Sequence, residues 1–188
     1  MNRSRIMLAL SAAALMLLPA CEKAEPGNPA AAAEKDGKEG TATTIAAGLP
    51  KDSRFLAAAK AAGIDATLAG PGPYTVLVPD NAAFEKLPAG TFDNWMKPES
   101  RPQLSSVLTY HILPGTVLAA DIGKAIDAGK GKAPLATMGG EVLTATREGG
   151  KIVLTDAAGN KAAIVGDDVT RSNGVVHRVD AVLSPRKA

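Results

Sequence analysis

The side chains best suited to catalysis are few in this sequence, which has two histidines and one cysteine. On paper, Ser105 or Ser106 supplies a nucleophile, His111 a base and Asp121 an orienting acid, the set that acyl transfer requires. Neither serine lies in the Gly-x-Ser-x-Gly turn that exposes the nucleophile of many hydrolases. We therefore predict no catalytic residue and no enzymatic activity.

Metal and cofactor sites need denser groupings than this chain offers. A single cysteine excludes an internal disulfide and a multi-cysteine metal site. His177 and Asp180 lie three positions apart on an expected strand, so they point to opposite faces and cannot share a metal. Asp167 and Asp168 could hold a cation such as calcium, but without regular calcium-loop spacing a solvated acidic turn is favoured. No glycine-rich phosphate loop joins a strand to a helix. We predict neither a metal nor a cofactor.

The charge balance argues against nucleic acid as a partner. The chain of 188 residues has 21 Lys and Arg against 19 Asp and Glu. Two of the basic residues, Arg3 and Arg5, lie within the first twenty, and without them the side-chain charge is zero. Nucleic-acid surfaces depend on clustered Lys and Arg that neutralise phosphates.

The first twenty residues are typical of an export signal. A basic start is followed by an almost wholly apolar run over residues 6–18, and Pro19 and Ala20 come next. That run is shorter than the roughly 20 residues that a helix needs to span a bilayer. We expect residues 1–20 to be a signal peptide and the protein to be exported.

The residues around Cys21 add an anchor to this expectation. Leu18-Pro-Ala-Cys21 resembles the lipobox of bacterial lipoproteins, in which the signal is cut before a cysteine that then receives lipid. An ordinary secretory signal that ends near a cysteine is the alternative. The resemblance implies lipid attachment at Cys21 and anchoring to the cell envelope by several acyl chains. Glu22, in place of the aspartate that resembles a retention signal, favours the outer membrane.

A linker separates the anchor from the folded part. Residues 22–43 contain no Val, Leu, Ile or aromatic residue. Such a segment buries too little apolar surface to offset the entropy of ordering it, so we expect a disordered tether that spans on the order of 25 Å. The sequence thus divides into a signal (1–20), a lipidated cysteine and linker (21–43), one folded domain (44–185) and a tail (186–188).

Helical patterns dominate the first half of the domain. Ser53, together with Asp52, is a capping residue for a helix that Gly63 ends. A Gly-Pro turn precedes a short strand over 74–78, and Asp80 and Asn81 are capping residues for a brief helix after it. Apolar residues spaced along one face predict a longer helix over 102–113.

Strand patterns dominate the second half. Residues 141–147 and 151–155 flank Glu-Gly-Gly, which predicts a hairpin. A turn at 157–160 leads to a strand over 161–167, and residues 175–183 form the last strand. The order of elements predicts an α+β domain, with helices mainly in the first half packed on a mostly antiparallel β wedge or sandwich.

Three motifs in this order resemble the fasciclin (FAS1) family. Residues 74–84, YTVLVPDNAAF, are similar to its first motif; Tyr110-His111 to its central motif; and residues 173–185, NGVVHRVDAVLSP, to its closing motif. The resemblance covers roughly residues 44–185 and implies a single fasciclin-like domain.

Two functions follow from the resemblance. It implies a membrane-tethered extracytoplasmic interaction or adhesion module that binds a protein or an envelope polysaccharide. The alternative is a carrier or sensor of a small hydrophobic ligand in an apolar cleft between helices and sheet. The low aromatic content, 3% of residues, counts against this alternative.

The motif histidines have structural and binding interpretations. The resemblance makes Tyr110 and His111 candidate binding residues, because the corresponding motif in animal matrix relatives is linked to integrin binding. A structural role for both is favoured here. His177 lies on the apolar side of the last strand, which favours a buried neutral histidine with one hydrogen bond.

Overall fold

The computed structural model describes residues 43–186. The expected signal peptide, the lipid site at Cys21 and nearly all of the expected linker lie outside the described residues. None of the helices in the described part is long and apolar enough to cross a membrane.

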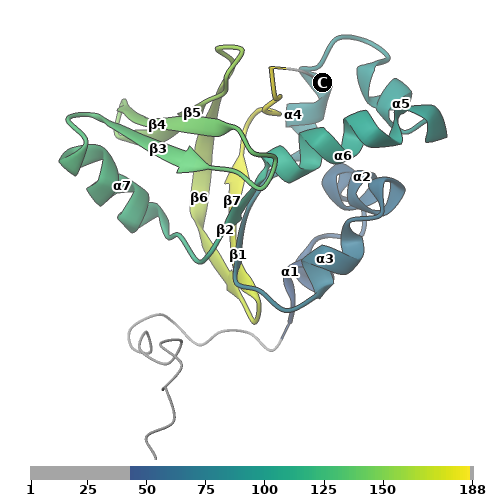
Figure 1. Cartoon of the computed structure of the whole chain (residues 1–188), viewed down its shortest axis with the longest axis horizontal. Coiled ribbons are helices and arrows are strands. Elements are labelled where there is room, and N and C mark those ends of the chain that lie inside the picture. The colour runs from purple at the N-terminus through teal and green to yellow at the C-terminus, as the bar shows by residue number, and fades with distance from the viewer. Residues whose placement is uncertain (1–42, 187–188) are drawn as a thin grey trace, which may run out of the picture. The chain divides into compact units, whose positions relative to one another are not determined.

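Helices and strands form separate layers. In Figure 1, helices α2, α3, α5 and α6 gather on one side of the sheet, and α7 lies next to β3 and β4 on the other. The helices are α1 (Ile45–Gly48), α2 (Arg54–Ala62), α3 (Asp65–Ala69), α4 (Asn81–Glu85), α5 (Thr91–Trp95), α6 (Arg101–Tyr110) and α7 (Ala119–Ala128), with a 3-10 turn at Pro98–Ser100. The strands are β1 (Tyr74–Pro79), β2 (Ile112–Pro114), β3 (Lys132–Ala136), β4 (Val142–Glu148), β5 (Lys151–Thr155), β6 (Lys161–Arg171) and β7 (Gly174–Val179).

The seven strands form one mostly antiparallel sheet in the order β2-β1-β7-β6-β5-β4-β3. Among these strands only the pair β1 and β7 is parallel. The register of β6 shifts between Val165 and Val169, and β3–β5 run across the direction of β1 and β7 (Figure 1). The sheet closes almost into a barrel, because the backbone N–H of Met138, just after β3, donates to the carbonyl of Ile112 in β2 at 2.7 Å.

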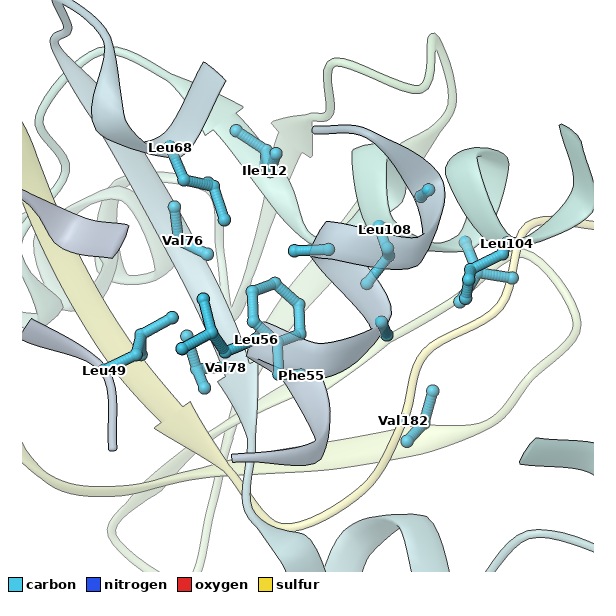
Figure 2. Packing of buried hydrophobic residues seen from close by; sticks show 14 of the residues in the cluster. Leu49, Phe55, Leu56, Leu68, Val76, Val78, Leu104, Leu108, Ile112 and Val182 are labelled. Atoms are coloured by element: carbon cyan, nitrogen blue, oxygen red, sulfur yellow. The ribbon is translucent and has the colours of Figure 1, made fainter. Parts of the chain in front are cut away.

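The two faces of β1 serve two hydrophobic cores. Val76 and Val78 face the helices, where α2 and α6 contribute Phe55 and Leu108 (Figure 2). Leu77 points to the opposite face and packs in a second cluster with α7 and β3–β5. Alternation along one strand therefore joins both halves of the domain.

Several predicted elements are confirmed with their caps. The Ser53 hydroxyl accepts from the backbone N–H of Leu56 at 3.3 Å, and Gly63 ends α2 in the left-handed conformation. Asp80 caps α4 by accepting from Ala83 N at 2.7 Å. The predicted hairpin is β4–β5.

Other boundaries were wrong. The helix predicted over 102–113 ends at Tyr110, because Ile112–Pro114 pairs with β1 as strand β2. The last strand ends at Val179 instead of residue 183. Helix α7 and strand β3 were not predicted, although they fill the segment between β2 and β4.

Candidate functional site

The first motif fastens two helices together through Asn81. Its side-chain oxygen accepts from the backbone N–H of Arg54 at 2.9 Å, and its side-chain nitrogen donates to the carbonyl of Asp52 at 3.1 Å. These groups lie at the start of α2, whose first N–H groups have no partner within the helix. Asn81 thus positions the loop before α2 against the end of β1.

The central motif is buried between the two cores. Tyr110 is fully buried, and its hydroxyl accepts from Ala157 N at 3.2 Å. Burial raises the pKa of Tyr110 above its ordinary value. Burial also lowers the pKa of His111 to about 4, so its ring is neutral near pH 7.

Both ring nitrogens of His111 are occupied by the backbone. Nδ1 lies 2.8 Å from the carbonyl of Val107, and Leu183 N donates to Nε2 at 3.1 Å. The N–H of Leu183 requires an acceptor at Nε2, so the single proton of the neutral ring is on Nδ1 and donates to Val107. His111 therefore has no free nitrogen for general-base catalysis or for a partner at the surface.

The closing motif begins with a second amide clamp. The side-chain oxygen of Asn173 accepts from Ile45 N at 2.8 Å, and its nitrogen donates to the carbonyls of Leu68 and Gly70 at 2.9 and 2.7 Å. The next residue, Gly174, has a φ of 150°, and a Cβ there would collide with the carbonyl of Tyr74. The turn thus packs directly against β1.

His177 is fully buried, as predicted, and helps to hold the start of α7. Its Nε2 lies 2.7 Å from the carbonyl of Val117. Its Nδ1 lies 3.0 Å from Asp168 Oδ1, and no hydrogen bond joins the two atoms. Asp168 Oδ2 accepts from the N–H of Ala119 at 2.9 Å, at the first residue of α7.

The structure separates the groups that could have formed a catalytic or metal site. Because His111 is occupied, it cannot activate Ser105 or Ser106. Asp180 accepts from Ala163 N, away from any shared position with His177. Within residues 43–186, no three acidic, histidine or cysteine side chains lie close enough to hold a metal ion.

A half-open groove of about 580 Å³ lies on the face of the sheet that packs against α2. We call it the β6–β7 groove. Val169 and Val176 form its apolar floor, and the loop before α2 forms one wall. The other lining residues are Gly48, Leu49, Pro50, Asp52, Ser53, Val78, Pro79, Asp80, Asn81, Asp167, Arg171 and Arg178. The groove falls within the size range of small-molecule sites, roughly 300–1,000 Å³.

The sequence did not indicate this groove or the two amide clamps. The pair Asn173-Gly174 is typical of a tight turn, and nothing local shows that the side chain of Asn173 reaches Ile45 and Leu68. Asn81 was interpreted as a possible helix cap, whereas Asp80 caps α4 and Asn81 reaches α2. Their place inside the motifs was the only available signal.

A comparison with known families decides the family of this chain. The family model described as the fasciclin domain matches residues 50–185. The chain belongs to the fasciclin family. Its likeness to the solved FAS1 domain pair of the insect cell adhesion molecule fasciclin I has a TM-score of 0.52 at 23% identity, over 69% of this chain and 44% of that one. At this identity the likeness concerns the fold.

Two bacterial relatives match over long segments. Protein sll1483 of Synechocystis is 39% identical over 145 residues, which are 77% of this chain and 73% of the relative. The cell surface glycolipoprotein MPB83 of Mycobacterium bovis is 35% identical over 114 residues, which are 61% of this chain and 44% of the relative. None of these descriptions names a reaction.

Proposed function

We propose that this fasciclin protein is a non-enzymatic, lipid-tethered interaction or adhesion module that binds a protein or an envelope polysaccharide outside the cytoplasm. The use of the motif side chains carries the proposal. Hydrogen bonds to backbone groups inside the domain occupy the polar side-chain atoms of Asn81, His111 and Asn173. Function is then left to the outer surface, which suits a recognition module.

The sequence before the domain supports the tether. Cys21 directly follows the segment expected to be an export signal, and the composition of residues 22–43 suits a spacer. Another fasciclin relative, MPB83, is described as a cell surface glycolipoprotein. Together these observations support export and a lipid anchor at Cys21, with the outer membrane favoured by Glu22.

Native mass spectrometry of the full chain, extracted gently from the membranes of its own host, tests this proposal. We expect a mass that includes acyl chains on Cys21, and a second protein or a glycan bound to it. The matched variant Cys21→Ser should lack the lipid and leave the membrane fraction while keeping its partner. Unlipidated wild-type protein overturns the tether, and lipidated protein that captures no partner in intact-cell crosslinking overturns the interaction role.

The β6–β7 groove favours a second function, a carrier or sensor of a small ligand. Its apolar floor and its volume suit a ligand with a hydrophobic body. A stoichiometric small-molecule adduct on the extracted chain is the expected observation for this second function. Its absence from protein extracted without detergent exchange contradicts the carrier.

A further inference from the structure

The floor of the β6–β7 groove is a row of valines that continues the hydrophobic core to the surface. Val169 and Val176 are paired across β6 and β7. Val78, which also lines the groove, lies on β1 two residues beyond the partner of Val176 and opposite Arg178. Val78 and Leu49, which forms the facing wall, belong to the helix-side core and approach each other in Figure 2. An apolar body in the groove would therefore contact buried side chains on two sides.

One cation at the groove has no partner among residues 43–186. Arg178 is exposed, and its guanidinium lies over Gly166, where a Cβ would be 2.7 Å from Nη2. Gly166 has a φ of 76°, so the register shift in β6 both requires the glycine and makes room for the arginine. Arg171, by contrast, donates to the carbonyl of Gly48 at 3.3 Å and fastens α1.

Of the carboxylates at the groove, one has a hydrogen-bond partner within the domain and two do not. Asp80 is occupied as the cap of α4. Asp52 and Asp167 are exposed, and neither carboxylate has a hydrogen-bond or ion-pair partner in the described part of the chain. The groove therefore offers one free guanidinium and two free carboxylates around an apolar floor.

From this arrangement we propose that the β6–β7 groove binds a zwitterionic amphiphile, with its apolar chain on the valine floor. Its anionic group pairs with Arg178, and its ammonium group pairs with Asp167 or Asp52. A purely anionic amphiphile would meet uncompensated carboxylates, and a purely cationic one would meet Arg178. This inference rests on the carrier function proposed for the groove, and it adds the chemistry of the head group.

The experiment compares four short-chain amphiphiles with the same alkyl chain, each below its micelle concentration, on the full-length protein. The probes are a lysophosphatidylethanolamine, an alkyl phosphate, an alkylamine and a monoacylglycerol, and calorimetry measures the dissociation constant of each. We expect the lysophosphatidylethanolamine to bind at least about tenfold more tightly than the other three, a difference of about 1.4 kcal/mol.

Variants that remove a charge from the groove should change the affinities of the charged probes in opposite directions. Arg178→Gln should weaken the zwitterion about tenfold and improve the alkylamine, whereas the double variant Asp52→Asn with Asp167→Asn should improve the alkyl phosphate. Arg147→Gln is the matched control, because Arg147 is exposed on β4 and pairs with Asp127 away from the groove. It should leave all four affinities unchanged.

The outcomes separate the two levels of the proposal. Equal binding of all four probes, unaffected by Arg178→Gln but weakened by Val169→Gln, overturns the head-group inference and leaves an apolar carrier. Absence of binding by every probe to correctly folded protein overturns the inference and the carrier together. The adhesion role is decided separately, by the crosslinking experiment.

Discussion

Asn173 is the residue whose side chain ties most directly together segments that are distant in the sequence. It satisfies an N–H at the start of α1 and two carbonyls around the end of α3. We expect Asn173→Ala to lower the free energy of unfolding by about 2 to 4 kcal/mol, because buried backbone groups lose their partners. Urea unfolding followed by circular dichroism measures the change.

Asn94→Ala is the matched control for this prediction. Asn94 is exposed on α5, and an exposed substitution should stay within about 0.5 kcal/mol. Equal effects of the two substitutions would show that the Asn173 hydrogen bonds contribute nothing specific.

His111 makes the stability of the domain depend on pH. Its pKa is about 4 in the folded protein and 6.5 in its ordinary state, because burial disfavours the charged ring. Between these values the unfolded chain binds a proton that the folded chain does not, so stability falls as the pH drops from 6.5 towards 4. The loss approaches about 3 kcal/mol below pH 4. Urea midpoints measured at pH 7, 6, 5 and 4 provide the test.

Replacing the ring isolates this effect. His111→Gln keeps a donor and an acceptor but cannot titrate, so its stability should vary less over the same range even if it is lower at pH 7. NMR of the wild-type ring protons gives a direct check, since a folded-state midpoint near 6.5 would contradict the assignment.

At the scale of elements, helix α7 depends on a capping side chain that comes from strand β6. No side chain of its own segment caps α7, and Asp168 on β6 accepts the N–H of Ala119 instead. We expect Asp168→Ala to cost about 1 to 2 kcal/mol, as loss of a helix cap does. Hydrogen exchange should become at least about tenfold faster in the first turn of α7.

The neighbouring carboxylate provides the control for Asp168. Asp167 is exposed and carries no hydrogen bond to α7, so Asp167→Ala should leave the exchange of α7 unchanged. Faster exchange in both variants would mean that the register shift of β6, and not the cap, holds the helix.

This distant cap explains which elements the sequence could predict. Helices α2 and α4 carry their caps, Ser53 and Asp80, directly before them, so local spacing was sufficient. Helix α7 has no capping side chain of its own and takes its cap from 49 positions away, which no local pattern reveals. The overlong helix over 102–113 failed for a similar reason, since β2 is a strand only through its pairing with β1.

At the scale of the whole molecule, the C-terminal segment closes the domain. Val182 packs in the helix-side core, Leu183 in the opposite core, and Ser184 N donates to Asp156. A chain that ends after Ala181 should lose about 3 to 6 kcal/mol from the two buried side chains alone. Thermal and urea unfolding measure this loss.

A chain that ends at Arg186 is the control for this truncation. It keeps both buried residues and the bonds of Arg186 to Glu141 and Ala157. It should unfold within about 0.5 kcal/mol of the full chain. A comparable loss in the two truncated chains would place the stabilising contribution in the last two residues instead.

The candidate site could not be predicted from the sequence, because it forms only in the folded molecule as a whole. The three motifs were sufficient for the family and for the buried position of His177. The β6–β7 groove draws its lining from the end of α1, the loop before α2, the end of β1, β6 and β7. Such a surface exists only after the chain has folded, so residue spacing could not predict it.

The place where the chain enters the domain has a mechanical consequence. The carbonyl of Thr43 accepts from Ser172 N at 3.1 Å, and Asn173 holds Ile45 directly after it. A pulling force applied through the N-terminal segment therefore loads the turn between β6 and β7 first. The short helix α1 would detach before any strand slides, so the molecule could lengthen under tension while its sheet remained folded.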